Sequence, residues 1–241
     1  MLKIEHLTKH YKGSTKGVTD LSLHIAPGDI YAFIGHNGAG KTTTLKCVAG
    51  IHGFDAGTIR IAGLDITEDP LESKRQMAYI PDNPDLYEYL TGIQYLSFIA
   101  DVFGVPAADR EARIQSLADA FEITASLGDL ISTYSHGMKQ KLAIISALIH
   151  QPKLLMLDEP FVGLDPKAAV ILKGMMRDIC RQGGAIFFST HVLEVAQKLC
   201  NKVAIIKDGA LVASGSMEQI VKPGQTLESI FMEVVEDASA D

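Results

Sequence analysis

The sequence predicts an α/β fold: a mostly parallel sheet, an antiparallel β layer and an inserted helical subdomain. Two alternating strand patterns open the chain, and a strand, glycine loop and helix follow them. A long helical stretch then interrupts the strand pattern before it resumes. The 241 residues suit one large domain, and 47% hydrophobic with 21% charged residues is the balance of a folded chain.

The first elements are strands. Residues 2–7 and 21–25 alternate apolar and polar side chains, and a Gly/Ser/Thr-rich loop at 13–17 separates them, which predicts an antiparallel edge layer. A Pro27-Gly28 turn then leads to a short buried strand at 29–34. Residues 41–50 follow as a helix that a glycine ends.

The middle of the chain is helical. Segments 93–103, 107–121 and 137–150 carry apolar residues at three-and-four spacing, which predicts an inserted helical lobe. Afterwards a strand at 154–157, a helix around 166–181, a strand at 185–189 and a helix at 193–200 alternate as parallel α/β units do.

The chain ends with a hairpin turn at 207–210, between strands 203–206 and 211–212, and two short helical segments. We therefore expect one domain over residues 1–241. Its core with the β layer takes 1–83 and 152–225, its helical subdomain takes 84–151, and a C-terminal helix with an acidic tail takes 226–241.

The glycine loop is the strongest motif. GHNGAGKT at 35–42 fits the pattern G-x-x-x-x-G-K-[ST], between a predicted strand and helix, and a chance match is expected in about one chain in a hundred. Its backbone N–H groups and the positive helix end suit a phosphate, Lys41 adds a cation, and Thr42 offers a hydroxyl to Mg²⁺. The expected nucleotide contacts are Gly35, His36, Asn37, Gly38, Ala39, Gly40, Lys41, Thr42 and Thr43.

Two acids end the apolar strand at 154–157. Asp158 would hold Mg²⁺ through water, and Glu159 would orient or deprotonate the water that attacks the γ-phosphate. Because neighbouring side chains on a strand point to opposite faces, the second role requires the chain to turn at Pro160. The alternative is an acidic strand end that merely caps the next helix.

Three further segments resemble one family. YSHGMKQK at 134–141 resembles the signature of ATP-binding-cassette (ABC) proteins, GLD at 163–165 its D-loop, and STH at 189–191 its switch-histidine segment. The resemblance covers nearly the whole chain. It implies a P-loop NTPase (RecA-like) core that binds ATP and Mg²⁺ and hydrolyses ATP to power transport by a separate membrane subunit.

The resemblance also implies a head-to-tail dimer with two ATP molecules between the protomers. Ser135 and Gly137 would then contact the γ-phosphate of ATP held by the opposite subunit, with Asp165 nearby, and His191 would hold the γ-phosphate within its own subunit. Physically, Ser135 begins a helix, where a hydroxyl and backbone donors can bind an anion. The alternatives are a simple N-cap for Ser135 and an ordinary hydrogen-bonded histidine for His191.

Tyr11 precedes the glycine loop at the interval where the family places an aromatic that stacks on adenine. Stacking tolerates different bases because every base has a π-face. The alternative is an ordinary half-buried aromatic.

Two departures from the family pattern bear on mechanism. Asp82, in AYIPDNP at 78–84, stands where the family usually has glutamine; it could approach Mg²⁺ or the attacking water but adds repulsion towards phosphate. His136 and Met138 replace a glycine and a glutamine of the signature. This version resembles subunits of bacterial ABC-2-type or Ecs-type exporters and of lantibiotic-immunity pumps, which favours export.

Partners and compartment follow from composition and from the family. A net charge of −7 without a basic patch disfavours nucleic acid, and the scattered Cys47, Cys180 and Cys200 favour a reducing compartment. Neither a signal peptide nor an apolar run of ~18 residues is present, so we expect a cytoplasmic protein at the inner face of the cell membrane. Its partners would be a transmembrane permease subunit and a second ATP-binding subunit, identical or different.

Residues 85–91, with the aromatics Tyr87, Tyr89 and Tyr95, are either the groove for that permease's coupling helix or routine core. Two competing functions remain at this point. One is a soluble ABC ATPase that acts on DNA or ribosomes, and the other is an ATP-binding regulatory module without turnover.

Overall fold

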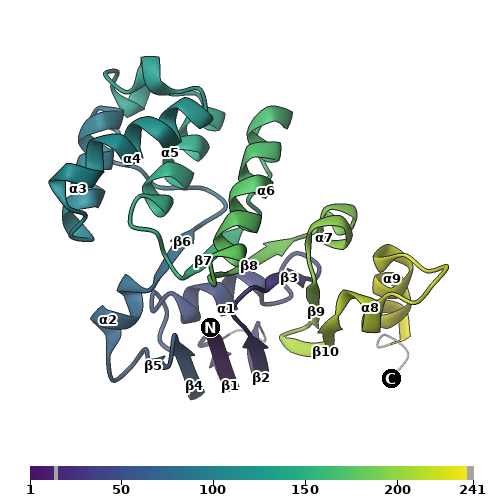
Figure 1. Cartoon of the computed structure of the whole chain (residues 1–241). Helices are drawn as coiled ribbons and strands as arrows, with labels where there is room; N and C mark the ends of the chain where they lie inside the picture. Colours follow the sequence, from purple (N-terminus) through teal and green to yellow (C-terminus); the bar gives the residue numbers. More distant parts are fainter. Residues whose placement is uncertain (14–15, 238–241) are drawn as a thin grey trace.

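The larger sheet has six strands in the order β10-β9-β3-β8-β7-β6 in the computed structural model, which describes residues 1–13 and 16–237 (Figure 1). Neighbouring strands pair in parallel except β10, which is antiparallel to β9. Every residue of β3, β7 and β8 is buried, as expected of parallel strands covered on both faces. The strands are β3 (Ile30–Ile34), β6 (Met77–Ile80), β7 (Leu154–Asp158), β8 (Ala185–Thr190), β9 (Lys202–Lys207) and β10 (Ala210–Ser216).

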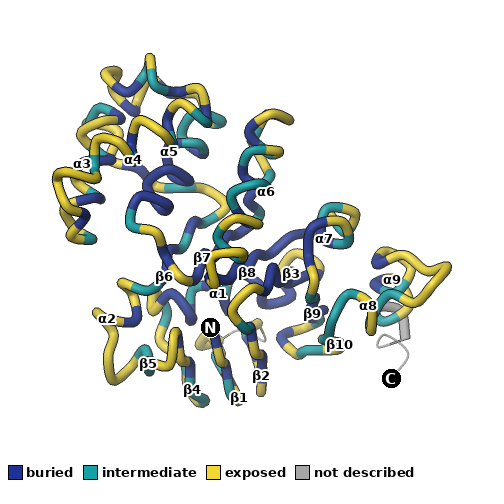
Figure 2. The backbone as a smooth tube through the Cα atoms, viewed as in Figure 1, coloured by how far each residue is buried: buried dark blue, intermediate teal, exposed yellow. Residues whose placement is uncertain are grey.

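Strand β3 divides its side chains between two hydrophobic cores. Tyr31 and Phe33 belong to the core shared with helix α1 (Lys41–Val48) and the second sheet. Ala32 and Ile34 belong to the core formed with the helices on the opposite face. This alternation is the two-residue period of a strand, and it lets β3 contribute to both cores. Figure 2 shows β3 in dark blue, the colour of buried residues.

The second sheet is antiparallel, with order β2-β1-β4-β5. Its strands are β1 (Leu2–His10), β2 (Gly17–Ile25), β4 (Ala56–Ile61) and β5 (Leu64–Asp65). The antiparallel layer predicted from the first two strands is therefore confirmed. Strands β4 and β5 and helix α2 (Pro70–Arg75) were not predicted from the sequence, because they are short segments with weak periodicity.

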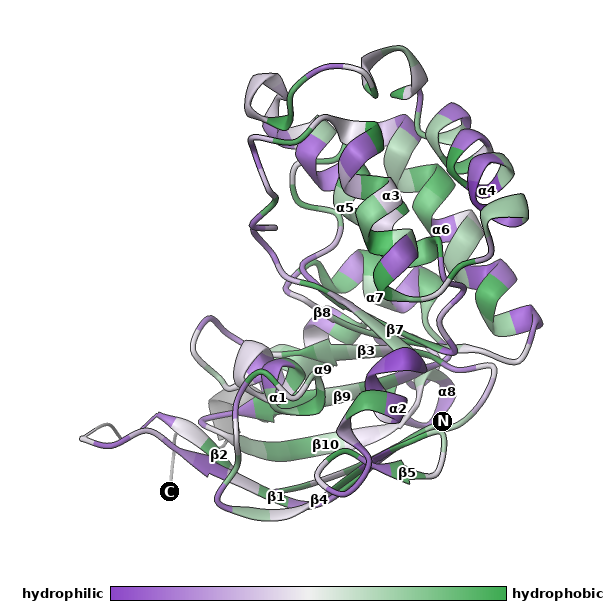
Figure 3. Ribbon diagram, turned by 90° about the vertical axis from the view of Figure 1, so that its left-hand side faces the viewer, coloured by the Kyte–Doolittle hydropathy of each residue, from purple (hydrophilic) through white to green (hydrophobic). Residues whose placement is uncertain are grey.

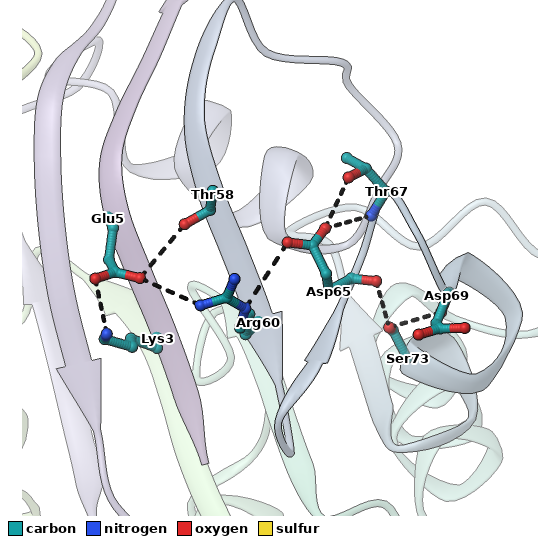
Figure 4. A network of polar contacts seen from close by, with 8 residues as sticks. All are labelled: Lys3, Glu5, Thr58, Arg60, Asp65, Thr67, Asp69 and Ser73. Atoms are coloured by element: carbon teal, nitrogen blue, oxygen red, sulfur yellow. Dashed lines mark hydrogen bonds and ion pairs between the residues drawn. The ribbon is translucent and has the colours of Figure 1, made fainter.

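A chain of polar contacts crosses the outer face of this sheet (Figure 4). Glu5 on β1 pairs with Lys3 at 2.7 Å and with Arg60 on β4 at 3.7 Å, and Arg60 lies 3.9 Å from Asp65 on β5. Asp65 also accepts hydrogen bonds from Thr67. Exposed ion pairs are worth about 0–1 kcal/mol each, so this network adds little to the stability of the fold.

The helical lobe lies to one side of the sheets, and Figures 1 and 3 show its helices grouped together above them. Thr91 and Gln94 form a capping box at the start of the first helix, and Ser135 caps the last one. The lobe holds α3 (Gly92–Val102), α4 (Ala107–Ala120), α5 (His136–Leu148) and the 3₁₀ turns η1 (Thr124–Ser126) and η2 (Ile131–Thr133).

The remaining helices flank the larger sheet and end the described chain. They are α6 (Pro166–Arg181), α7 (Leu193–Leu199), α8 (Met217–Ile220) and α9 (Leu227–Asp237). Residues 238–241 of the expected acidic tail lie outside the described residues. Within residues 1–13 and 16–237, none of the helices has the length and apolar character needed to cross a bilayer.

Candidate functional site

Four parallel strands deliver the predicted motifs to one edge of the larger sheet. The glycine loop follows β3 and Asp82 follows β6. Asp158 ends β7, Glu159 comes directly after it, and His191 follows β8. These strands are neighbours or near neighbours in the sheet, and their carboxyl ends point the same way. Ligands of open α/β sheets bind at this edge.

Two positions of the glycine loop leave no room for a side chain. A Cβ at Gly35 would overlap the carbonyl oxygen of Ile206. Gly40 has φ +112°, and a Cβ there would lie 3.1 Å from Gly17 O. Gly40 is also the N-cap of α1 and gives it no side-chain hydrogen bond, so the first N–H groups of that helix face the loop as a potential anion site.

Lys41 is held at the base of this loop and is only 7% exposed. Its Nζ donates to Gly35 O at 2.6 Å and to His36 O at 3.2 Å. Burial lowers the pKa of the Lys41 ammonium, and the nearby Glu159 and Asp158 carboxylates oppose that shift. The loop carbonyls and these acids therefore stabilise the charge of a poorly hydrated cation.

Asp158 is 2% exposed and tightly hydrogen-bonded. Thr42 Oγ1 donates to its Oδ2 at 2.7 Å, and Ser189 Oγ donates to its Oδ1. A hydroxyl and a carboxylate oxygen side by side are hard donors that fit Mg²⁺, which keeps several waters and takes few protein ligands. In the described part of the chain, no group of three or more His, Cys, Asp and Glu side chains is arranged to hold a metal ion by itself.

Glu159 turns the chain by its own backbone. Its φ is +49°, in the left-handed region, and its N–H donates to Ser189 O at 3.2 Å. The turn therefore begins at Glu159, one residue earlier than the Pro160 turn expected from the sequence. As a result, Asp158 and Glu159 both line the same pocket although they are adjacent in a strand-ending segment. Glu159 Oε1 also lies 2.9 Å from His191 Nδ1.

The pocket at this edge has a volume of about 570 Å³. Tyr11 closes one side, with its OH 3.3 Å from Thr43 Oγ1, and Asp82 enters from β6 while its Oδ1 accepts the Asn83 N–H at 2.9 Å. Lys16 and Gly17, at the start of β2, also line the pocket, and neither was predicted as a site residue. The lining residues are Tyr11, Lys16, Gly17, Asn37, Gly38, Gly40, Lys41, Thr42, Thr43, Asp82, Asp158 and Glu159.

Ser135, Gly137 and Asp165 do not line this pocket. Ser135 caps α5 by accepting the Met138 N–H at 3.3 Å, and Asp165 caps α6 by accepting the Ala168 N–H at 2.8 Å. Lys141 of α5 pairs with Asp165 at 2.7 Å, and this contact, together with the Ala168 hydrogen bond, lowers the pKa of Asp165. The signature segment and the D-loop segment therefore contact each other, away from the phosphate loop of the same chain.

Comparisons with known proteins agree with this arrangement. The family model for the ABC transporter matches residues 18–162. The chain is 32% identical to the ABC-type transporter ATP-binding protein EcsA of Bacillus subtilis, over 98% of this chain and 97% of the relative. It is also 32% identical to the Nod factor export ATP-binding protein I of Paraburkholderia xenovorans, over 92% and 72%.

A solved structure of an ATP binding subunit of an ABC transporter superposes on the chain with a TM-score of 0.93. The two are 33% identical, and the match covers 98% of this chain and 99% of the other. The likeness therefore includes the helical lobe and the C-terminal helices as well as the motifs. The chain belongs to the ABC transporter family and is an ATP-binding subunit of that family.

Proposed function

We propose that this protein hydrolyses MgATP at the interface of a head-to-tail dimer and so drives a separate membrane subunit. One observation carries the proposal. The pocket gathers Lys41, the oxygen donors of Thr42 and Asp158, and Glu159, whereas Ser135 lies on the helical lobe outside it. A second protomer can supply Ser135 and Gly137 to the open side of that pocket, which completes the site.

The chain's own groups divide the work on ATP. Tyr11 stacks on adenine, while Lys41 and the N–H groups at the start of α1 hold the phosphates. Thr42 and Asp158 would hold Mg²⁺, with Asp82 nearby, and that ion would supply positive charge to offset the charge of the phosphates. Glu159 accepts a proton from the attacking water, and His191, paired with Glu159, contacts the γ-phosphate.

The dimer supplies the remaining donors. Ser135, Gly137 and the N–H groups at the start of α5 place the positive end of a helix against the γ-phosphate bound by the partner. Asp165 lies next to that helix through its ion pair with Lys141. Preorganised donors of this kind are typically worth ~2.7–4 kcal/mol each in a transition state.

The membrane partner docks on the helical lobe, for which we propose residues 84–151. Tyr87 packs against Tyr89, Tyr95 and Phe98 with ring centroids 5.8 to 6.0 Å apart, and Tyr89 is 74% exposed. We assign this aromatic cluster as the docking site of the permease's coupling helix, and we propose that the protein lies at the cytoplasmic face of the membrane. The signature variant of this chain and the chain's likeness to a Nod factor export protein support export as the direction of transport.

The test of the catalytic assignment uses two substitutions. Glu159→Gln should bind ATP as tightly as the wild type, while phosphate release falls about 10²- to 10⁴-fold because the proton acceptor is lost. Lys41→Ala should lose ATP binding itself. Binding is measured by titration with a fluorescent ATP analogue, and turnover by phosphate release. Wild-type turnover in Glu159→Gln would refute the base assignment, and a wild-type protein that never releases phosphate would favour the regulatory module.

A further inference from the structure

We propose that Phe231, on the C-terminal helix α9, positions the phosphate loop for ATP through His36; the inference rests on the phosphate-binding role proposed for that loop. The two ring centroids lie 5.0 Å apart, with the planes at 58°. Tilted aromatic contacts of this geometry are attractive beyond the area they bury. Helix α9 lies beyond the segment that carries the ATP-binding motifs, so its contact with their first loop was not expected from the sequence.

Helix α9 has a firm support of its own. Leu227, its first residue, is fully buried, and the Leu227 N–H donates to Gln197 Oε1 on α7 at 2.8 Å. Phe231 lies one helical turn further, on the same face, and is 8% exposed. The helix is therefore anchored on α7 and not on the loop. Phe231 extends from this fixed support to the ring of His36.

His36 connects that contact to the groups that face the phosphates. Its side chain is exposed at the loop, but its carbonyl oxygen accepts from Lys41 Nζ at 3.2 Å and from the Ala39 N–H at 3.1 Å. A displacement of His36 therefore moves an acceptor of Lys41 and the turn that shapes the loop. Phe231 limits that displacement from outside the pocket.

Phe231 also bridges two segments of the site. A cavity of about 440 Å³ lies between the glycine loop and the segment after β8. Phe231 and Leu193 line it together with Gly35, His36, Asn37 and His191. The aromatic ring thus sets the spacing between the glycine loop and His191. We propose that both of these contact the γ-phosphate. Holding both in place before ATP arrives lowers the ordering cost of binding.

The principal test measures ATP affinity, turnover and thermal stability of full-length Phe231→Ala. We expect the Kd and KM for ATP to rise about two- to tenfold, which is the worth of one aromatic contact, while kcat at saturating ATP stays unchanged. Phe231→Tyr keeps the ring and should restore wild-type affinity. Met232→Ala, a neighbouring residue that is 49% exposed, is the matched control and should not change the Kd.

A double-mutant cycle separates positioning from simple core packing. His36→Ala should raise the Kd as much as Phe231→Ala does, and the double variant should be no worse than either single one, because both remove the same contact. Since His36 is exposed, His36→Ala folds and carries the test even if Phe231→Ala does not. A wild-type Kd in His36→Ala or in folded Phe231→Ala, or additive losses, would overturn the inference. ATP binding by Lys41→Ala would instead refute the role of the loop.

Discussion

At the scale of the residue, the backbone of Glu159 decides what its side chain can do. A regular strand would send Asp158 and Glu159 to opposite faces, but φ +49° at Glu159 brings both to one pocket. A non-glycine residue in this region costs on the order of 1–3 kcal/mol, and such strain concentrates at functional sites. The hydrogen bonds from the Glu159 N–H to Ser189 offset part of this cost.

Asp82 is the residue whose replacement should improve the enzyme. Its carboxylate shares the pocket with Asp158 and Glu159, so it adds negative charge where we propose that the phosphates of ATP bind. Asp82→Gln should raise turnover, or lower the Mg²⁺ concentration that gives half-maximal activity, by roughly three- to tenfold, because the repulsion is partly screened.

Asp82→Asn is the matched control for this prediction. It removes the charge but keeps the short side chain, so it separates repulsion from reach. Both parameters are read from phosphate release across a Mg²⁺ titration. Equal turnover and equal Mg²⁺ dependence in the wild type and Asp82→Gln would count against the idea.

The three thiols should be unreactive in the native protein. Burial raises the pKa of Cys47 and of Cys180 to about 11, and raises the pKa of Cys200 further still. A raised pKa keeps the neutral thiol dominant below that value, so only about a thousandth of Cys47 or Cys180 is thiolate at pH 8. Iodoacetamide labelling followed by mass spectrometry should be slow at pH 8 and complete in denaturant. Rapid labelling of any of them in the folded protein would contradict the burial.

At the scale of the element, Asp29 fixes the start of the central strand β3. The residue is 5% exposed, and its Oδ2 accepts from the Ala26 N–H at 2.6 Å and from Lys202 Nζ at 2.9 Å. Asn201 Nδ2 donates to Oδ1 at 3.1 Å, and Asn201 Oδ1 accepts the Ile30 N–H at 2.8 Å. This network ties β3 to the beginning of β9, its parallel neighbour.

Asp29→Ala should therefore lower the free energy of unfolding by about 2–4 kcal/mol, since three part-buried hydrogen bonds to its carboxylate are lost. Urea denaturation followed by circular dichroism measures the loss. Glu194→Ala removes an exposed pair with Lys198 on α7 and should leave the denaturation midpoint unchanged. Equal losses of unfolding free energy in the two variants would show that the Asp29 network contributes no more to stability than an exposed ion pair.

At the scale of the whole molecule, the separation of Ser135 from the phosphate loop predicts complementation between two inactive variants. Lys41→Ala damages the pocket and Ser135→Arg damages the signature, so neither alone should hydrolyse ATP. In a two-fold, head-to-tail dimer of identical chains, each mixed dimer contains one site with both parts intact. An equal mixture should recover about a quarter of wild-type phosphate release, because half of the dimers carry one good site of two. Absence of any recovery would oppose the shared site.

The motifs and the main elements could be predicted from the sequence alone. Local spacing and periodicity were enough for the glycine loop before α1, the acid-ended strand β7 and the lobe helices α3 to α5, since each depends on neighbouring residues. The predicted helix 166–181 has the bounds of α6, because Asp165, Pro166 and the glycines after Arg181 punctuate it.

The features that join distant segments became known only from the three-dimensional fold. The short strands β4 and β5 are defined by pairing with β1 and with each other. The turn at Glu159 is defined by its hydrogen bond to Ser189 on β8. The contact of Phe231 with His36 is defined by the docking of α9 on α7. Such contacts depend on how elements pack, and a pattern within one segment carries no information about the side chains that another segment brings to it.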